Sequence, residues 1–517
     1  MKFNRITPAL WFIIAISLFT AFFQLGQLPL LDPDEPVYGE TPREMLLFND
    51  WLSPRIYGDF WYDKPPLFYW LVAFSFKLFG INEFAARFPS ALLAVATVIL
   101  IYQAGRKLFD ERTGLLSALV LTTMVEFFYL SKAAVTDMTL LFCLTASLLG
   151  FLLKRYWLLY LFAGLATLAK GPIGLVFPGT IIFLYLLAGR RWAILKQMQI
   201  LRGCLIYLLV AAPWYGFMAY THGSPFIDTF FGYHNVTRFT SPEHPEGVLW
   251  YYYIPVMLIG FLPWTSVLVQ AVKNSLTSYG QTFSYLQFLN IWGFFILLFF
   301  SISQTKLVSY ILPMYPPLAL VIGWYLNRLY ERRQKLSFIS WPIVATVLLG
   351  LLGVGLVFAM QRQNELQTGT IVSIVLFVFA VGGLWAAYLK RSVLMMIFSQ
   401  AIPFALFSAV LVVFLVGPVA SSLSMKSAAE NFKNIYDGQA PIYVAKFLRP
   451  GFAYYTHLYG QELDDKRKSV SSTVIDEAVR GTYFVVRYQD YTVLNEKTKQ
   501  SLQLLWQEQD KMILIKQ

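Results

Sequence analysis

Residues 30–45 read LLDPDEPVYGETPREM and residues 58–70 read GDFWYDKPPLFYW, and both stretches lie between the first two hydrophobic runs of the chain. They concentrate carboxylates and a lysine beside sequence that is otherwise apolar. Ionisable groups next to membrane spans are costly and usually serve a function. The two motifs therefore indicate chemistry at a membrane surface.

The composition is that of an integral membrane protein. Of the 517 residues, 57% are hydrophobic and 14% are charged, whereas soluble domains carry about 25% charged residues. The net charge of +12 comes from short basic clusters between apolar runs, as in cytoplasmic loops, so we expect no binding to nucleic acid. Cys143 and Cys204 lie inside apolar runs and predict neither a disulfide framework nor a thiolate metal site.

Apolar runs long enough to cross a bilayer predict an all-α polytopic protein with about 13 transmembrane helices. They lie near residues 8–26, 85–105, 113–130, 137–153, 156–169, 171–188, 200–219, 249–270, 284–300, 306–326, 338–360, 370–389 and 393–416. The run 65–80 is shorter and contains Lys77. We expect this run to lie in the membrane interface as an amphipathic helix.

Basic clusters set the expected orientation. They fall in alternate loops, at residues 2–5, 105–112, 154–155, 189–196, 327–335 and 390–391. The positive-inside rule then makes the N-terminus cytoplasmic and places the first loop, 27–84, on the outer face. Residues 1–416 are predicted to form the transmembrane domain. Strand-like and helix-like runs alternate over 417–517, which predicts a small α/β domain on the periplasmic side.

The loops expected on the outer face carry most of the residues that could perform chemistry. These residues are Asp34, Glu35, Tyr38, Asp63, Lys64, Asp137, Lys170, His234, Arg238, His244, Lys306 and Tyr310. Carboxylates mixed with cations suit a group transfer with a phosphate leaving group. Cations offset the charge that develops on the phosphate, and a carboxylate accepts a proton or orients the nucleophile.

Each of these residues also has a structural interpretation. Asp34 and Glu35 could be residues of a helix N-terminus, where the helix dipole favours acids. Asp137 could cap the helix that follows it, and Lys64 could extend its ammonium group towards lipid headgroups. The two histidines are more often surface residues than metal ligands. The signal therefore lies in the whole set rather than in any one residue.

The two motifs occur together with FGINEFAARFPSAL (79–92), AKGPIG (169–174) and YHNVTRF (233–239). In this order they resemble bacterial integral-membrane glycosyltransferases of the GT-C type. The chain is similar to the aminoarabinose transferases of lipid A over roughly residues 5–330, and more distantly to protein O-mannosyltransferases. The resemblance implies inverting transfer of a sugar from undecaprenyl phosphate to lipid A or another envelope acceptor, at the periplasmic face of the inner membrane, without a nucleotide cofactor.

The resemblance also implies roles for the residues named above. The catalytic carboxylates would be Asp34 and Asp137, the donor phosphate would be bound by Lys64, Arg238 and Lys170, and the cavity would be lined by Glu35, Tyr38, Tyr310 and Lys306. Members of the family can bind a divalent metal, zinc included, near the phosphate. In this chain Asp63, His234 and His244 would be its ligands.

Two positions depart from the family's pattern. Val37 stands where aminoarabinose transferases tend to have arginine, and Asp63 stands where they tend to have glutamate. Both changes affect sugar or metal recognition more than leaving-group chemistry, so the sugar stays open between 4-amino-4-deoxy-L-arabinose and a related pentose or hexose.

A flippase for polyprenyl-linked sugars, or a secondary transporter, is the main alternative function. Transporters place ionisable groups near the bilayer midplane on broken helices. Here such groups gather in outer loops and at the ends of spans, which favours an enzyme.

Overall fold

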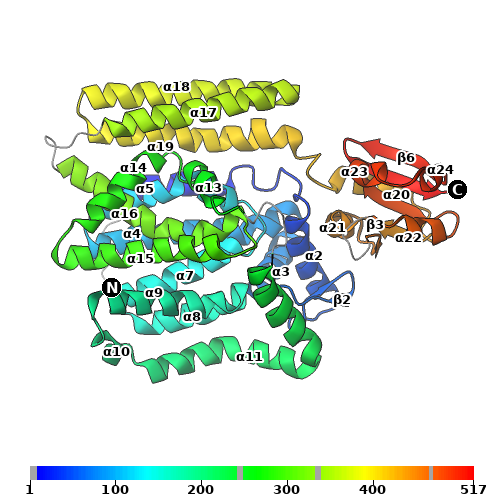
Figure 1. The fold of residues 1–517 in the computed structure, drawn as a ribbon, viewed down its shortest axis with the longest axis horizontal. Helices are drawn as coiled ribbons and strands as arrows, with labels where there is room; N and C mark the ends of the chain where they lie inside the picture. Colours follow the sequence, from blue (N-terminus) through cyan, green and yellow to red (C-terminus); the bar gives the residue numbers. More distant parts are fainter. Residues whose placement is uncertain (1–7, 242–248, 332–338, 465–469) are drawn as a thin grey trace. The chain divides into compact units, whose positions relative to one another are not determined.

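The computed structural model describes residues 8–241, 249–331, 339–464 and 470–517. The chain forms two compact units, each assembled from segments that are distant in sequence (Figure 1). The first unit comprises Met1–Phe23, Tyr62–Phe68 and Pro89–Phe414, and the second comprises Gln24–Trp61, Tyr69–Phe88 and Leu415–Gln517. The second unit therefore combines the carboxy-terminal residues with most of the first loop, which a boundary at residue 416 alone does not anticipate.

Seven helical runs among the described residues are long and apolar enough to cross a membrane. They are α4 (Glu83–Leu108), α11 (Ile200–Ile227) with η1 (Asp228–Thr237) and α12 (Arg238–Thr240), α15 (Gly280–Ile302), η3 (Val308–Met314) with α16 (Tyr315–Glu331), α17 (Ser340–Arg362), η4 (Asn364–Leu366) with α18 (Gln367–Leu389), and α19 (Val393–Val410) with η5 (Leu411–Val416) and η6 (Gly417–Val419).

Two further pairs of helices reach the length and apolarity of a span only when each pair is taken together, and each pair is sharply bent. Helices α5 (Glu111–Thr122) and α6 (Val125–Ser131) meet at 68°, and helices α13 (Tyr253–Gly260) and α14 (Thr265–Leu276) meet at 102°. The shorter apolar helices are α1 (Pro8–Phe22), α3 (Leu67–Phe79), α7 (Asp137–Leu152), α8 (Tyr156–Lys170) and α9 (Ile173–Gly189). Between α9 and α11, α10 (Ile194–Gln197) forms a single turn.

Every apolar run predicted to span the bilayer contains a helix or a bent pair, and the run 65–80 contains α3. The polytopic helical fold is thus confirmed. The exact number of spans stays a prediction, because α1, α7, α8 and α9 are each shorter than 18 residues and would cross a bilayer only where it is thin.

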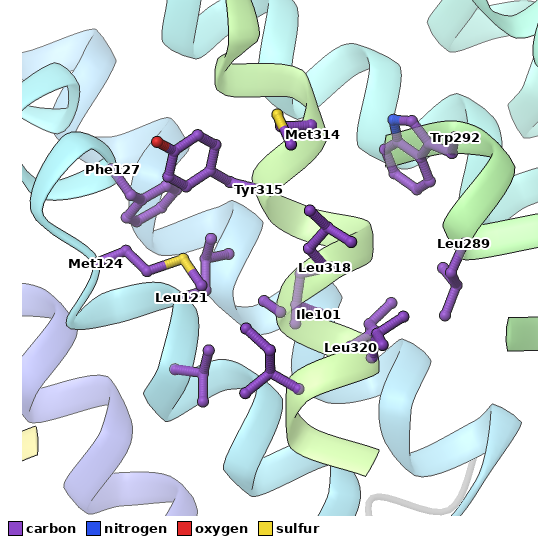
Figure 2. Close-up of a cluster of buried hydrophobic side chains, with 14 of the residues drawn as sticks. Ile101, Leu121, Met124, Phe127, Leu289, Trp292, Met314, Tyr315, Leu318 and Leu320 are labelled. Atoms are coloured by element: carbon purple, nitrogen blue, oxygen red, sulfur yellow. The ribbon is translucent and has the colours of Figure 1, made fainter. Parts of the chain in front are cut away.

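Helix α16 lies in the core of the first unit, where Tyr315 and Trp292 are fully buried (Figure 2). The ring of Tyr315 stacks on Phe261, with 4.1 Å between ring centroids. Helices α4 and α5 approach so closely that a Cβ atom added to Gly105 would lie 2.7 Å from the Cα atom of Gly114. Membrane helices associate largely through such packing, for which small residues clear the space.

In the second unit, the first loop forms α2 (Asp34–Leu47) and a hairpin of β1 (Arg55–Ile56) and β2 (Asp59–Phe60). The hairpin turn has positive φ angles at both central residues, 60° at Tyr57 and 82° at Gly58. A two-residue turn of this kind matches the twist of the strands, and glycine adopts it without steric cost.

The carboxy-terminal residues form a five-stranded mixed sheet in the order β4-β3-β5-β7-β6. Its strands are β3 (Ile442–Val444), β4 (Gln461–Glu462), β5 (Tyr483–Arg487), β6 (Leu502–Glu508) and β7 (Lys511–Lys516). Strand β3 pairs in parallel with β4 and β5, whereas β7 pairs antiparallel with β5 and β6. The associated helices are α20 (Lys426–Ile435), α21 (Arg449–Thr456), α22 (Ser472–Glu477), α23 (Tyr488–Thr492) and α24 (Glu496–Gln500).

Side chains alternate along the central strand β5. Tyr483 and Val485 join one apolar cluster, and Phe484 and Val486 join another. Because successive side chains of a strand point to opposite faces, both faces of the sheet are covered. The side of the membrane on which this sheet lies stays a prediction.

Candidate functional site

Asp63 lies at the centre of a charged cluster in the first unit. Its Oδ1 atom is 2.8 Å from Nζ of Lys64, 2.7 Å from Nδ1 of His234 and 3.4 Å from Nη1 of Arg238. The four side chains are largely buried, and Arg238 is the most exposed at 27%. One carboxylate therefore faces three basic groups, which we call the Asp63 cluster.

Two separate segments bring these residues together. Lys64 precedes Pro65 and Pro66, which are well suited to the start of helix α3 because the first turn needs no backbone donors. His234 and Arg238 are four residues apart in the η1–α12 run, so they lie on the same side of a helix. The wide π-helical turns of η1 belong to a class that is rare and frequent at functional sites.

A charged pair of Asp137 and Lys170 lies where α7 begins and α8 ends. Nζ of Lys170 is 2.7 Å from Oδ1 of Asp137 and 5.0 Å from the ring centroid of Tyr310. An acid in the first turn of one helix and a base in the last turn of another are both favoured by the helix dipoles. Asp137 is the first residue of α7, but the N-cap is Thr136 and no described side chain caps this end, so the interpretation of Asp137 as a capping residue is wrong.

An electrostatic interaction links the Asp63 cluster to this charged pair. Burial raises the pKa of Asp63, but Lys64, His234 and Arg238 outweigh it and hold that pKa well below its usual range. Burial lowers the pKa of Lys64, and repulsion from Arg238 and Lys170 lowers it further, although Asp63 opposes the change. The charge of Lys170 thus disfavours the protonated form of Lys64. The region carries more basic groups than carboxylates, as a binding site for an anion requires.

Lys306 and Tyr62 make two further polar contacts in the first unit. Lys306 donates to the backbone oxygen of Ser303 at 2.7 Å, and burial lowers its pKa. Tyr62, beside Asp63, lies 3.1 Å from Nδ1 of His222. The sequence analysis did not select His222, and its local sequence carries no signal of this contact.

A buried carboxylate that was not among the predicted site residues lies in the bent pair α5–α6. Glu126 accepts a hydrogen bond from Tyr315 and is only 3% exposed. An ionisable residue within an apolar run marks a functional candidate by default, so the position of Glu126 within the predicted span 113–130 was a signal that could have been used.

The first predicted motif lies in the second unit. Asp34 is exposed and is the first residue of α2. Glu35 is buried and accepts from Arg87 at 2.6 and 2.9 Å, and from the backbone N–H of Leu31 at 2.9 Å. Tyr38 packs its ring 5.9 Å from that of Tyr69. The expectation that acids begin a helix here is confirmed, and the contacts of Glu35 are those of a structural ion pair.

Helix α2 carries a further polar group, formed by Glu40, Arg43 and Glu44 of the first motif. Arg43 donates to both carboxylate oxygens of Glu40 at 2.7 Å. Burial and the neighbouring Glu40 raise the pKa of Glu44 to about 7, although the backbone N–H of Gly58, 3.0 Å away, opposes the shift. The spacing of Glu40, Arg43 and Glu44 along one helix face could have indicated this network.

The expected metal site stays a prediction, because one of its three ligands lies outside the described residues. Asp63 and His234 are close together, but His244 lies outside the described residues, and no group of three His, Cys, Asp or Glu side chains is found among those described. Lys64 and Arg238 already face the same carboxylate oxygen, and they would repel a divalent cation. We derive no step through a metal.

The chain is similar to known sugar transferases. Residues 63–217 match the family model described as dolichyl-phosphate-mannose-protein mannosyltransferase. An undecaprenyl phosphate-alpha-4-amino-4-deoxy-L-arabinose arabinosyl transferase of Edwardsiella ictaluri is 31% identical over 66% of this chain, and the match spans 63% of that protein, less than two thirds of its length. The protein of Pseudomonas fluorescens with the same description, numbered 2, is 30% identical over 72% of this chain and 70% of its own length. The chain belongs to this arabinosyl transferase family.

The fold of the chain is also similar to that of a solved membrane protein. The crystal structure of ArnT from Cupriavidus metallidurans bound to undecaprenyl phosphate has a TM-score of 0.81 to this structure, covers 98% of both chains and is 21% identical. The prediction of a GT-C type glycosyltransferase is confirmed. As a member of the arabinosyl transferase family, the protein is a multi-pass membrane glycosyltransferase.

Proposed function

We propose that this protein transfers a sugar from an undecaprenyl-phosphate donor to lipid A or another acceptor of the cell envelope. The sugar is 4-amino-4-deoxy-L-arabinose or a related pentose or hexose. The observation that carries the proposal is the Asp63 cluster and its electrostatic interaction with Lys170, an excess of basic groups in a member of the arabinosyl transferase family. The relatives are named for this transfer, and ArnT of similar fold was crystallised with undecaprenyl phosphate.

The basic groups serve the leaving group. The bond between the anomeric carbon and a phosphate oxygen breaks while an acceptor oxygen attacks from the opposite side, so the anomeric configuration inverts. Negative charge develops on the departing phosphate, and Lys64, Arg238 and Lys170 stabilise it through charge-assisted hydrogen bonds. Such a leaving group needs no activation by a nucleotide.

Asp63 and Asp137 hold these cations in place. Asp63 lies within 3.4 Å of both Lys64 and Arg238, so it fixes the two groups before the donor arrives. Asp137 does the same for Lys170. Preorganised charges of this kind avoid the cost of reorganisation during the reaction.

The role of Asp34 depends on the acceptor. A hydroxyl acceptor must lose a proton, and Asp34 would accept it as general base. A phosphate of lipid A is already ionised near neutral pH, so Asp34 would then orient the acceptor or hold an amino group of the sugar. The exposure of Asp34 at the start of α2 suits either role.

The protein is proposed to lie in the inner membrane with its N-terminus in the cytoplasm. The donor site and the carboxy-terminal sheet then face the periplasm, as the alternate basic loops predict. Val37 and Asp63 replace the arginine and the glutamate that aminoarabinose transferases tend to have at these positions. The sugar is therefore identified by a direct assay of different donors.

The test is incubation of the purified protein with radiolabelled undecaprenyl-phosphate sugars and lipid A. We expect labelled sugar on lipid A or another added acceptor, with stoichiometric release of undecaprenyl phosphate. Movement of the labelled lipid across a vesicle bilayer, without cleavage, would instead identify a flippase and overturn the proposal.

A second experiment separates the two roles of Asp34. Asp34→Asn should abolish transfer to a hydroxyl acceptor, because asparagine accepts no proton at neutral pH. Turnover near that of the wild type would discard the base role. Asp59→Asn is the matched control, since Asp59 is an exposed carboxylate of the same loop.

A further inference from the structure

In the second unit, the residues just before α2 make a hydrogen bond to helix α21 of the carboxy-terminal segment. The Oη atom of Tyr455 accepts a hydrogen bond from the backbone N–H of Leu30 at 2.7 Å and donates to Glu83 at 3.3 Å. Lys426 lies 2.8 Å from the same carboxylate. Leu30 is fully buried, and a buried backbone N–H needs a partner, so this hydroxyl fixes the chain four residues before Asp34.

Asp32 makes a second connection to the same part of the chain. Its backbone N–H donates to the carbonyl of Leu423 at 2.9 Å. A Cβ atom added to Gly451 would lie 2.2 Å from Oδ1 of Asp32 and 2.7 Å from Cβ of Met425. Real Cβ atoms do not approach so closely, so the Asp32 carboxyl occupies space that only a glycine at position 451 leaves open.

A third contact lies one turn into α2. A Cβ atom added to Gly39 would lie 2.9 Å from the ring of Tyr454, which is itself buried. The ring of Tyr454 on α21 therefore packs directly against the backbone of α2 at Gly39. Connections at residues 30, 32 and 39 bracket Asp34, and the Arg87–Glu35 ion pair holds the residue that follows it.

We propose that α21 positions the amino-terminal end of α2 for sugar transfer, with Tyr455 and Gly451 as positioning residues that act through Asp34. The inference rests on the proposed function. An exposed functional side chain on rigidly held backbone is the arrangement that keeps a reacting group in place. The carboxy-terminal segment thereby contributes to turnover through the position of Asp34.

The test uses the full-length protein with Tyr455→Phe, which removes one oxygen atom, and Gly451→Ala, which forces Asp32 to move. A misplacement of about 1 Å can lower a rate by about 100-fold, so we expect kcat for transfer to fall by at least about tenfold in both variants. The KM for the undecaprenyl-phosphate sugar should stay within about twofold, because the phosphate-binding residues belong to the first unit. Tyr488→Phe is the matched control, since Tyr488 is 51% exposed.

A double-variant comparison separates positioning from loss of folded protein. In the Asp34→Asn background, assayed with an acceptor for which that variant still turns over, Gly451→Ala should lower the remaining rate by less than about twofold, because residues that act through one another are not additive. The same tenfold loss in both backgrounds would overturn the proposal, as would wild-type kcat in Tyr455→Phe. A rise in KM as large as the fall in kcat, together with weaker binding of undecaprenyl phosphate by the two variants, would also overturn it, since that pattern indicates loss of folded protein.

Failure of the inference is distinguishable from failure of the proposed function. If the wild-type protein releases no undecaprenyl phosphate from any donor, the proposed function falls. If the wild type is active and both variants keep its kcat, only the positioning role falls.

Discussion

Replacing Lys64 with glutamine removes the cation that lies closest to Asp63 along the chain. Its Nζ atom is 2.8 Å from the carboxylate, and the side chain is 14% exposed. Asp63 keeps His234 and Arg238 at 2.7 and 3.4 Å, so the variant leaves no unpaired buried carboxylate and should fold. The change therefore tests phosphate binding rather than stability.

The expected loss follows from one charge-assisted hydrogen bond to the departing phosphate. A hydrogen bond to a charged group contributes about 1.5–3 kcal/mol, which corresponds to a fall of about 10- to 150-fold in kcat/KM. Burial places Lys64 in a low-dielectric setting, so the loss should lie towards the upper end. Lys170 and Arg238 remain, so some activity should persist.

The measurement is steady-state transfer from a radiolabelled undecaprenyl-phosphate sugar, with release of undecaprenyl phosphate as the readout. Lys390→Gln is the matched control, because Lys390 is exposed at the end of α18. A kcat/KM for Lys64→Gln within about threefold of the wild type would refute the assignment of Lys64 to the leaving group.

Three further predictions concern buried charges. Asp137→Asn should lower kcat by about tenfold or more, because Lys170 loses the carboxylate that orients it; unchanged turnover in the transfer assay would contradict this. The folded protein raises the pKa of Glu44 from 4.5 to about 7, so the unfolded chain loses this proton at lower pH, and the free energy of unfolding falls as pH rises between these values. Glu44→Gln should remove that fall, so that between about pH 5 and pH 8 the variant becomes more stable than the wild type by up to about 2 kcal/mol. Thermal unfolding across this pH range measures the difference, and parallel pH profiles of the two proteins would contradict the prediction. Arg87→Met should cost about 3–5 kcal/mol of stability, because Glu35 would remain buried without its partner; an unchanged unfolding temperature would show that the pair contributes nothing.

Local properties of the sequence were sufficient to predict the helical architecture. The apolar length of each run is a property of that run alone, so α4, α15, α17 and α18 follow from hydropathy. The breaks at α5–α6 and α13–α14 do not, because a bent pair and a straight helix have the same apolar length. By contrast, Gly223, whose φ of 58° and ψ of −139° break α11, lies just beyond the predicted span 200–219 and before Pro225, where Gly and Pro mark the end of the apolar run.

The candidate site was predictable in its residue types but not in its pairings. Lys64, Arg238 and Lys170 were expected to act together, and in the structure an electrostatic interaction links their two groups. Which carboxylate each cation faces depends on tertiary packing, so the shared position of Asp63 was not expected. The partnership of Glu35 with Arg87 was missed for the same reason, since the two residues are 52 positions apart.

The most direct test of the donor site is the affinity of the purified protein for undecaprenyl phosphate compared with undecaprenol, which has the same chain without the phosphate. We expect the wild type to bind the phosphate at least about tenfold more tightly. A variant carrying both Lys64→Gln and Arg238→Gln should lose most of this preference, since of the three proposed phosphate-binding cations only Lys170 remains. Equal affinity in the wild type, or an undiminished preference in the double variant, would contradict a phosphate site at the Asp63 cluster.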